Sequence, residues 1–226
     1  MQRLRKVLIT GTSSGIGKAT ASLFLSKGFF VVGIDIKPTA IAHQNYKHFQ
    51  ADVSKAELLP DIKDLEIVIN NAGTIKEEDA IQTNLVGYVN VGEKYGFQQG
   101  VKAVINVGSI AARVGLDHPL YSASQGGRIS YTRNLAVRLG RFNKAKVNSI
   151  SFGAVHSGLE PSLYENKDFM EAVANESILK KWMSTEEAAE WIYFVAVKNQ
   201  SMTGQDILLD NGEEANCNFI DGGDAI

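Results

Sequence analysis

Short runs of apolar, mostly β-branched residues recur along the chain, and stretches with helical spacing separate them. Most of these runs are apolar at successive positions rather than at alternate ones, as expected for parallel strands that are covered on both faces. The alternation predicts a single-domain α/β fold, a doubly wound parallel sheet of about seven strands with helices on both faces. The predicted strands are residues 7–10, 29–35, 67–70, 103–107, 146–151 and 207–209, with 48–53 as a weaker candidate.

Several of the connecting segments carry helix signals. Apolar residues recur at helical spacing over residues 16–24, and Gly28 is a C-terminal stop signal. Ser184 and Glu187 have the spacing of a capping box. Residues 54–65 separate the third and fourth strands, so the helix between them must be short or irregular. The apolar stripe expected after the capping box comprises Ala188, Trp191, Ile192 and Val195.

The composition is that of a globular protein, with 44% hydrophobic and 21% charged residues in a chain of 226. A formal net charge of -2 argues against nucleic acid or a membrane as a partner. The single cysteine, Cys217, excludes an internal disulfide framework and fits a reducing compartment. We therefore expect a cytoplasmic protein with one domain over residues 1–226. Its cofactor-binding part should span about 1–110 and its catalytic and substrate part about 109–226.

A glycine-rich turn follows the first predicted strand and opens the first helix. Gly11 allows a sharp turn, Gly15 lets a pyrophosphate approach the backbone, and Gly17 lets helix and strand pack closely. The free N–H groups of the helix N-terminus would face the anion. The strand–turn–helix context predicts a dinucleotide site of the Rossmann type. The other residues of this turn that are predicted to bind the dinucleotide are Ser13, Ser14 and Ile16.

Asp35 ends the second predicted strand. A carboxylate there can accept hydrogen bonds from both adenosine ribose hydroxyls, and it would repel a 2′-phosphate. Of its neighbours, Ser14 and Ile36 supply no positive charge, although Lys37 could. The sequence therefore favours NAD(H) over NADP(H), with a solvated loop aspartate as the alternative.

With its glycine-rich turn and the aspartate at the end of the second strand, the chain resembles the short-chain dehydrogenase/reductase family over nearly its whole length. The spaced TGxxxGIG turn and an NNAG turn after the fourth strand carry the resemblance, together with a closing segment that contains Thr203-Gly204. The resemblance implies that further residues line the cofactor. These are Asp52, Val53, Asn71, Ala72, Gly73, Gly153, Val155 and Ser157.

The resemblance also implies a catalytic set. Tyr121 would exchange a proton with the substrate oxygen, and Ser109 would hydrogen-bond the same oxygen. Asn84 matches the helix asparagine that holds a relay water in the family. Tyr121 and Gln125 are four residues apart, so they share one helix face and would both contact the cofactor.

The chain departs from the family at Gln125, where the YxxxK motif has a lysine. In the family that lysine binds the nicotinamide ribose and lowers the pKa of the tyrosine. A unit charge roughly 4 Å away is worth about 3 pKa units at an effective dielectric of about 20. Gln125 can still donate a hydrogen bond to a ribose hydroxyl, but it carries no charge. We therefore expect Gln125→Lys to raise alcohol oxidation more than carbonyl reduction.

Residues 154–183 are expected to hold the substrate-covering segment. Its apolar side chains either line a lid over a mainly apolar substrate or form the buried face of a surface helix. The histidines lack metal-ligand spacing, and Trp182 is expected to be a packing residue, as is Trp191. The resemblance implies a homodimer or homotetramer paired through helices over roughly 79–95 and 121–138. The apolar side chains of the covering segment are Leu159, Leu163, Tyr164, Phe169 and Met170.

Three functions remain open from the sequence. The first is an NAD(H)-dependent oxidoreductase that interconverts a hydroxyl and a carbonyl on a small organic molecule. The second is a nucleotide-binding or regulatory protein without turnover, which the missing lysine favours and the retained Tyr121, Ser109 and Asn84 oppose. The third is a structural subunit whose partner supplies the activity.

Overall fold

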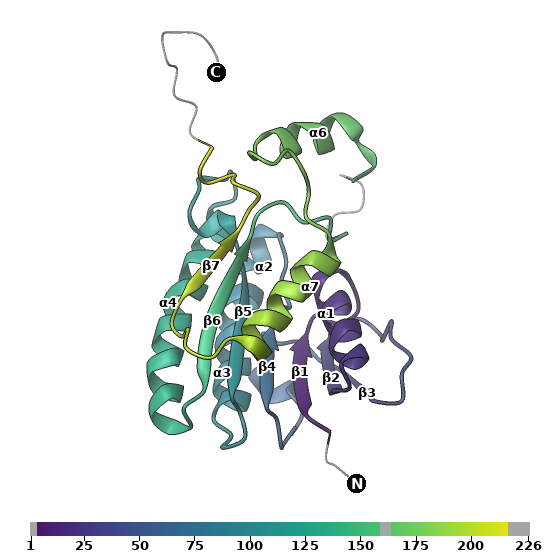
Figure 1. Cartoon of the computed structure of the whole chain (residues 1–226), viewed down its shortest axis with the longest axis vertical. Helices are drawn as coiled ribbons and strands as arrows, with labels where there is room; N and C mark the ends of the chain where they lie inside the picture. The colour runs from purple at the N-terminus through teal and green to yellow at the C-terminus, as the bar shows by residue number, and fades with distance from the viewer. Residues whose placement is uncertain (1–3, 159–163, 217–226) are drawn as a thin grey trace.

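A computed structural model describes residues 4–158 and 164–216 as a seven-stranded, entirely parallel sheet between two layers of helices (Figure 1). The strand order is β3-β2-β1-β4-β5-β6-β7, so the chain winds outward from β1 in both directions. This confirms the predicted fold class. The strands are β1 (Lys6–Thr10), β2 (Phe30–Asp35), β3 (Tyr46–Gln50), β4 (Ile67–Asn70), β5 (Ala103–Ser109), β6 (Lys146–Phe152) and β7 (Asp206–Leu209).

Helices cover both faces of the sheet. One face packs against α1 and α7, which contact each other, and the other packs against α3 and α4 (Figure 1). A smaller helix, α6, lies beyond the carboxyl edge of the sheet, after β6. The helix bounds are α1 (Gly15–Ser26), α2 (Glu77–Ile81), α3 (Gly87–Gly96), α4 (Pro119–Phe142), α6 (Lys167–Asn175) and α7 (Thr185–Tyr193).

The two cores explain why the strands are apolar at successive positions. Along β1, Val7 and Ile9 point into the core beneath α1 and α7, whereas Leu8 points into the core beneath α3 and α4. All three side chains are fully buried. Because every residue of such a strand meets a packed layer, an alternating polar pattern would leave polar groups buried without partners.

The crossover from β3 to β4 contains only a short 3₁₀ turn, η1 (Ala56–Leu58), which confirms the expected irregular connection. The third strand itself was placed too late, at 48–53 instead of Tyr46–Gln50. Asp52 leaves the ladder because its Oδ1 accepts hydrogen bonds from the backbone N–H and hydroxyl of Ser54, at 2.9 and 2.7 Å. This local turn ends the strand and leaves β3 as a half-exposed edge.

Helix α7 begins with the capping box predicted from the sequence. Ser184 Oγ accepts from the backbone N–H of Glu187 at 3.1 Å, and the Glu187 carboxylate accepts from the backbone N–H of Ser184 at 2.9 Å. Ala188, Ile192 and Val195 are buried as expected. Trp191 is not, so its assignment to the buried stripe and to core packing was wrong.

Trp191 is 43% exposed, and its ring packs edge-on against Phe194, which is also exposed. The buried residues of α7 are Ala188, Ala189 and Ile192, so its buried face does not include Trp191.

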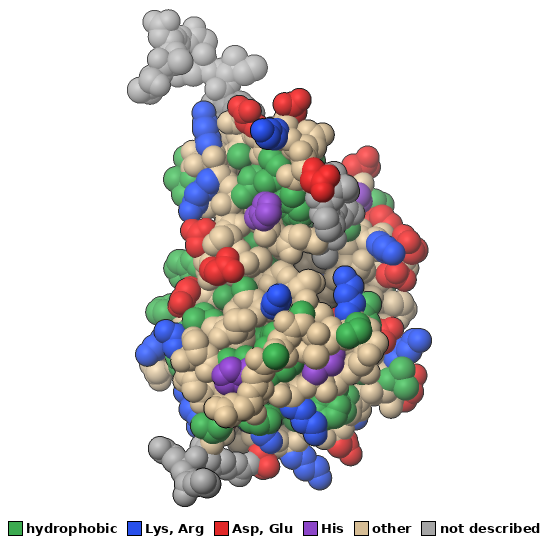
Figure 2. All heavy atoms as spheres, turned by 90° about the vertical axis from the view of Figure 1, so that its right-hand side faces the viewer, with side chains coloured by type: hydrophobic (Ala, Val, Ile, Leu, Met, Phe, Trp, Pro, Cys, Tyr) green, Lys and Arg blue, Asp and Glu red, His purple; other side chains and the backbone are tan. Residues whose placement is uncertain are grey.

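Within the described residues, none of the helices has the length and hydropathy needed to span a membrane. Acidic and basic side chains are interspersed on the face shown in Figure 2. This mixture agrees with a formal net charge near zero.

The capping box gives a test of the fold. Ser184→Ala removes the acceptor for the Glu187 N–H and should lower the free energy of unfolding by about 1 kcal/mol, measured by urea denaturation. Thr185→Ala, one residue further on, is the control, because the Thr185 hydroxyl contacts only the exposed Glu186 carboxylate at 3.0 Å among the bonds described. Equal losses in the two variants would contradict the capping role.

Candidate functional site

The predicted site residues gather at one edge of the sheet. In a parallel sheet all carboxyl ends meet at the same edge, and the order of this sheet reverses direction between β1 and β4. The glycine-rich turn follows β1, Asp35 ends β2, Asn71 follows β4, and Ser109 ends β5. Ligands of doubly wound sheets bind in the crevice above this switch point.

The turn after β1 depends on glycine at two positions. Gly11 has φ +75°, a left-handed conformation that favours glycine. A Cβ on Gly11 would lie 2.7 Å from Asn71 Nδ2, and one on Gly17 would overlap the carbonyl oxygen of Gly11. Any side chain at these positions would therefore push the first helix away from the strands. The turn stays narrow, and the N–H groups of the first turn of α1 remain available to an anion.

A hydroxyl that the sequence analysis did not single out joins the two central turns. Thr10 Oγ1 accepts from the backbone N–H groups of Asn71 and Ala72, at 2.9 and 3.0 Å. Asn71 Nδ2 donates in return to the carbonyl oxygen of Thr10 at 3.0 Å. Thr10 is fully buried. The turns after β1 and β4 are thus held together as the floor of the crevice.

Asp35 lies where the sequence placed it, beside the glycine turn. Its carboxylate accepts from the backbone N–H of Ser13 at 2.9 Å and of Lys37 at 2.8 Å. Ser13 also donates its hydroxyl to the carbonyl oxygen of Pro38 at 2.9 Å. Each bond uses one lone pair of a different carboxylate oxygen, so further acceptor capacity remains on both oxygens. The carboxylate is therefore oriented by backbone and still able to bind hydroxyls.

Asp52 and Val53, which were predicted at the adenine, follow β3, and Ile36 directly follows Asp35 at the end of β2. Ile36 is 63% exposed directly after β2. Val53 is buried, and its Cγ2 would touch a Cβ placed on Gly87. Asp52 turns onto Ser54 as described above. The exposed aliphatic side chain of Ile36 is suited to pack against a flat ring such as adenine.

The predicted nicotinamide-side residues follow β6. Val155 pairs with Met183 in a parallel bridge, which ties the segment to the start of α7. The carbonyl oxygen of Ser157 would lie 2.7 Å from a Cβ on Gly15, so Ser157 sits over the glycine turn. A Cβ on Gly153 would meet Asp210 after β7 at 2.8 Å.

Ser109 and Tyr121 lie on two packed elements, the 3₁₀ turn η3 (Ile110–Ala112) and the first turn of α4. Ser109 Oγ accepts from the backbone N–H of Ala111 at 3.2 Å, so its hydroxyl hydrogen is free to be donated. Tyr121 is half-buried. Glu77 of α2 accepts from the backbone N–H groups of Leu120 and Tyr121, at 2.8 and 3.0 Å. The carboxylate of Glu77 thus caps α4 and fixes the backbone that carries Tyr121.

Asn84 is fully buried in a single π-helical turn, η2 (Gln82–Val86), between α2 and α3. Its side chain accepts from the N–H of Thr74 at 2.9 Å and donates to the Thr74 carbonyl at 2.8 Å. Its Nδ2 also reaches Ser124 Oγ at 3.3 Å. Asn84 therefore holds the segment after β4 against α4. Its main-chain carbonyl oxygen accepts a hydrogen bond from Arg128 Nε at 2.5 Å.

Gln125 faces the sheet from α4 and is 1% exposed. Its Oε1 accepts from Arg128 Nη1 at 2.8 Å, and the same Nη1 donates to the carbonyl oxygen of Val107 at 2.7 Å. The Arg128 guanidinium carbon lies 3.9 Å from the ring centroid of Tyr88. Burial raises the pKa of Tyr88 to about 12, so its phenol stays protonated at neutral pH. Gln125 is therefore linked directly to a buried arginine that the sequence analysis overlooked.

The predicted covering segment forms an aromatic cluster. Tyr164 packs edge-on against Trp182 with ring centroids 5.6 Å apart, and Trp182 Nε1 donates to the Met170 carbonyl at 2.8 Å. Trp182 packs as predicted, and Phe169 lies 6.5 Å from it. Phe169 and Met170 are half-buried and their helical neighbours Asp168 and Glu171 are exposed, so both alternatives, a lid and the buried face of a surface helix, stay open. Leu159 and Leu163 lie outside the described residues.

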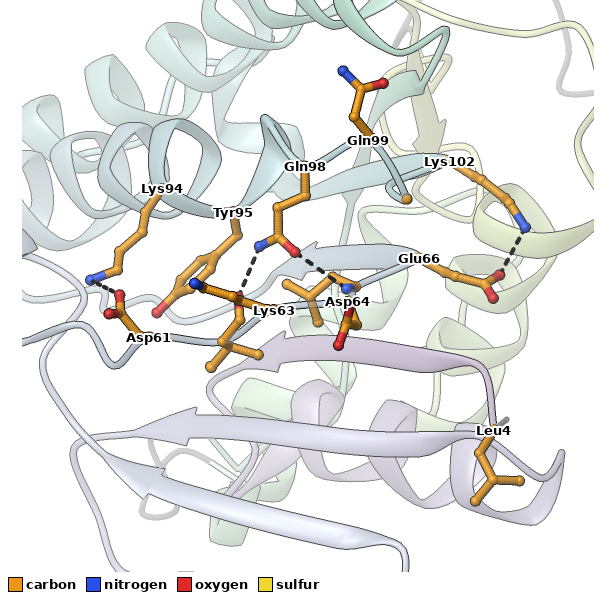
Figure 3. Close-up of a pocket in the computed structure, with 13 residues that line it drawn as sticks. Leu4, Asp61, Lys63, Asp64, Glu66, Lys94, Tyr95, Gln98, Gln99 and Lys102 are labelled. Carbon is orange, nitrogen blue, oxygen red and sulfur yellow. Dashed lines mark hydrogen bonds and ion pairs between the residues drawn. The ribbon is translucent and has the colours of Figure 1, made fainter. Parts of the chain in front are cut away.

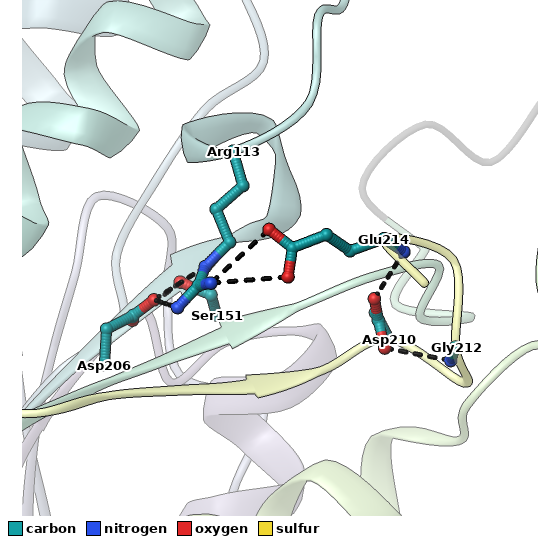
Figure 4. A network of polar contacts seen from close by, with 6 residues as sticks. All are labelled: Arg113, Ser151, Asp206, Asp210, Gly212 and Glu214. Atoms are coloured by element: carbon teal, nitrogen blue, oxygen red, sulfur yellow. Dashed lines mark hydrogen bonds and ion pairs between the residues drawn. The ribbon is translucent and has the colours of Figure 1, made fainter. Parts of the chain in front are cut away.

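A charged network ties the segment after Ser109 to the last strand (Figure 4). Arg113 donates from Nη2 and Nε to Asp206 Oδ2, at 2.9 and 3.2 Å, and from Nη1 to Glu214. Asp206 is 3% exposed in its side chain, and its Oδ1 accepts from Ser149 and Ser151. The hydrogen bond to Asp206 raises the pKa of Arg113. The bridge holds β5, β6 and β7 in place beneath the site.

A pocket of about 630 Å³ lies at the opposite, amino edge of the sheet (Figure 3). Two of its three lysines pair with its own carboxylates: Lys94 with Asp61 at 3.5 Å and Lys102 with Glu66 at 3.2 Å. It contains none of the predicted site residues. Because ligands of such sheets bind at the carboxyl edge, the pocket carries no part of the candidate site.

His118 begins α4 with Nδ1 3.9 Å from Glu77 Oε1, and it is 46% exposed in its side chain. Among residues 4–158 and 164–216 the structure groups no three His, Cys, Asp or Glu side chains that could hold a metal ion.

Three site residues were missed for different reasons. Thr10 precedes the glycine motif, and Glu77 acts through space on a helix more than forty residues later. Arg128 could have been found, because it lies seven residues after Tyr121 and three after Gln125, on the same helix face. A charged residue on a helix face that is predicted to pack against the sheet indicates a buried charge, and Arg128 is such a residue.

The chain was then compared with known proteins. The sequence model of a family described as enoyl-(acyl carrier protein) reductase matches residues 11–214. The 3-oxoacyl-[acyl-carrier-protein] reductase FabG of Thermotoga maritima is 30% identical over 91% of this chain and 96% of its own length. The glucose 1-dehydrogenase of Gluconobacter oxydans is 27% identical over 92% of this chain and 91% of its own.

Solved structures share the fold. A 4-hydroxyisoleucine dehydrogenase complexed with NADH superposes with a TM-score of 0.84 at 24% identity, covering 94% of this chain and all of the other. An aldohexose dehydrogenase from Thermoplasma acidophilum reaches a TM-score of 0.86 at 20% identity, covering 96% of each chain.

The Arg113 network predicts that the stability of the fold depends on the Arg113 side chain. Arg113→Met leaves the buried carboxylate of Asp206 with only its serine donors, so the free energy of unfolding should fall by about 2–3 kcal/mol. Arg138→Met is the matched control, because its ion pair with Glu93 is exposed and should be worth about 0.5–1 kcal/mol. A loss no greater than that of the control, by urea denaturation, would show that Arg113 is dispensable.

Proposed function

The chain belongs to the short-chain dehydrogenase/reductase family, and from that premise we propose that it interconverts a hydroxyl and a carbonyl group on a small organic substrate with a nicotinamide dinucleotide. The observation that carries the proposal is the placement of Ser109 and Tyr121 on packed elements at the carboxyl edge, with Ser109 two strands along the sheet from the glycine turn. The relatives are named for different substrates, so we assign none to this chain.

The residues fit a dinucleotide. A Cβ on Gly11 or Gly17 would collide with Asn71 or with the Gly11 carbonyl oxygen, so glycine at both positions keeps the turn close to the N-terminus of α1. We assign the diphosphate to the backbone of residues 13–17, and the adenosine ribose to Asp35. The nicotinamide half lies against Asn71, Ala72, Gly73 and the segment of Gly153, Val155 and Ser157, with Ile36, Asp52 and Val53 toward the adenine.

When bound, the nicotinamide group supplies or accepts a hydride. The chain's own part is to move a proton and to orient the reacting oxygen. In carbonyl reduction Tyr121 donates its phenolic proton to the substrate oxygen, and in alcohol oxidation the phenolate takes that proton. Ser109 donates a hydrogen bond to the same oxygen and polarises it.

We propose that NAD(H) is preferred over NADP(H). The Asp35 carboxylate is held by the N–H groups of Ser13 and Lys37, so it cannot swing away from a 2′-phosphate without losing both bonds. Lys37 donates to Asp35 from its backbone N–H, and no ion pair of its ammonium group with Asp35 is found among the described residues. The preference therefore rests on a fixed negative charge at the end of β2.

Gln125 supports a second candidate, a dinucleotide-binding protein with no turnover, because the usual lysine is absent. We rank it second because Tyr121, Ser109 and Asn84 are all retained. The side chains of Ser109 and Asn84 and the backbone N–H of Tyr121 are each held by a hydrogen bond. Location in the cytoplasm and assembly as a homodimer or homotetramer through α3 and α4 remain proposals.

The assignment of Tyr121 predicts the outcome of one substitution. In a panel of ketones and aldehydes with NADH, Tyr121→Phe should lower turnover at least about 100-fold, because the proton donor is lost. Tyr193→Phe, which removes a hydroxyl from α7 beside Phe24, is the control and should keep wild-type turnover. Tight NADH binding with no turnover of any compound by the wild type would favour the binding protein instead.

The charge of Asp35 predicts the cofactor preference. Asp35→Asn keeps the shape and removes the repulsion, so the ratio of NADPH to NADH affinity, measured by calorimetry, should rise about tenfold or more. Glu57→Gln, a charge removed from η1, should leave the ratio unchanged. If the Asp35 variant also leaves the ratio unchanged, Asp35 does not set the preference.

A further inference from the structure

Helix α4 begins without a cap from its own N-cap residue. His118 occupies the N-cap position and Pro119 the first helical position, but within the described part of the chain the His118 side chain caps no N–H group of the helix. An N-cap side chain ordinarily accepts from the second or third helical N–H, here those of Leu120 and Tyr121. Tyr121, the proposed proton donor, therefore lies in a first turn that would fray without another acceptor.

Glu77 supplies that acceptor from a different helix, α2. Its Oε2 accepts from the Leu120 N–H at 2.8 Å, and its Oε1 accepts from the Tyr121 N–H at 3.0 Å. The Glu77 side chain is 31% exposed, so both bonds are partly shielded from water. The dipole of a long helix also favours a carboxylate at its N-terminus. A single side chain therefore satisfies both N–H groups of the turn that carries Tyr121.

The segment that carries Glu77 is itself held in place. The fully buried Asn84 side chain accepts from the Thr74 N–H at 2.9 Å and donates to the Thr74 carbonyl at 2.8 Å. Thr74 Oγ1 in turn accepts from the backbone N–H of Lys76, the N-cap residue of α2, at 3.1 Å. Glu77 follows directly. Its backbone is therefore tied to a buried side chain through two successive sets of hydrogen bonds.

The carbonyl side of Tyr121 leads to the same asparagine. Ser124 Oγ donates to the Tyr121 carbonyl oxygen at 2.6 Å, and Asn84 Nδ2 donates to Ser124 Oγ at 3.3 Å. The bond from Asn84 enters α4 three residues beyond Tyr121, so among the described bonds the cap of the first turn comes from Glu77. The backbone of Tyr121 is thus held through its N–H by Glu77 and through its carbonyl by Ser124.

We propose that Glu77 is a positioning residue for the proton transfer: it caps α4 from outside the helix and thereby holds Tyr121 in place relative to Ser109. The proposal rests on the proposed function, in which Tyr121 exchanges the proton. Glu77 bonds to the backbone of Tyr121, so it acts without touching the substrate. A misplacement of about 1 Å can cost on the order of 100-fold in rate, so a frayed first turn slows turnover while the glycine turn still binds the cofactor.

The test compares turnover with hydrogen exchange at the two capped amides. Glu77→Ala removes both acceptors, whereas Glu77→Gln keeps the shape and one acceptor oxygen. Nuclear magnetic resonance should show exchange at the Leu120 and Tyr121 amides about 10-fold faster in Glu77→Ala, with a smaller change in Glu77→Gln. The kcat for carbonyl reduction should fall in the same order, by about 10- to 100-fold in Glu77→Ala. The Kd for NADH, measured by calorimetry, should stay within about twofold of the wild type.

A cap supplied from within α4 should rescue the loss. In Glu77→Ala/His118→Asp a carboxylate stands at the N-cap, where it can accept from the same two N–H groups. Slow exchange should return, and kcat should recover to within about threefold of the wild type. Glu78→Gln is the matched control, because it removes the neighbouring charge of α2 from an exposed side chain and should change neither readout. Circular dichroism and thermal melting confirm that each variant is folded.

Slower turnover with unchanged exchange at both amides would overturn the proposal, because the carboxylate would then act on the substrate directly. Faster exchange with wild-type kcat would overturn it as well, and so would restored exchange without restored kcat in the double variant. If Glu77→Ala does not fold, Glu77→Gln decides by the same comparison. A wild type that turns over no compound would refute the proposed function, and loss and rescue of slow exchange would then leave the capping role of Glu77 standing.

Discussion

The structure depends on a parallel sheet that is buried on both faces. Helices α1 and α7 cover one face, and α3 and α4 cover the other, so each strand must be apolar at successive positions. The predicted site residues then lie at the strand ends, and the polar side chains buried within the sheet, such as Asn106, Ser149 and Ser151, are hydrogen-bonded. Because the carboxyl ends share one edge, residues far apart in the chain meet there: the turns after β1 and β4 through Thr10 and Asn71, and the end of β5 with the start of α4.

A buried charge gives this site its particular character. Arg128 stacks on Tyr88 and donates to Asn84, Val107 and Gln125, and thereby joins the π-helical turn, β5 and α4. A hydrogen-bonded guanidinium keeps its charge when buried, which an ammonium group does less readily. Gln125 thus stands beside a buried arginine, whose Nη1 donates to the Gln125 Oε1 at 2.8 Å.

Much of the site could be predicted because its signals are local. The glycine turn, Asp35 at a strand end, and the capping box of Ser184 each depend on a few neighbouring residues, and the structure places them as expected. What failed depended on tertiary contacts. The burial of Trp191 is decided by where α7 meets α1, and the partners of Arg128 come from three elements. Helical spacing gives the face of a residue but not what that face meets.

The proposed nicotinamide dinucleotide would lie along the carboxyl edge, across the switch point between β1 and β4. Its binding can be measured by isothermal titration calorimetry of the intact chain with NADH and NAD⁺. We expect saturable binding of at least one redox form at one site per chain, and its loss when Gly17 is replaced by valine in a variant that remains folded. Absence of heat and of thermal stabilisation with both redox forms, and with NADPH, would contradict it.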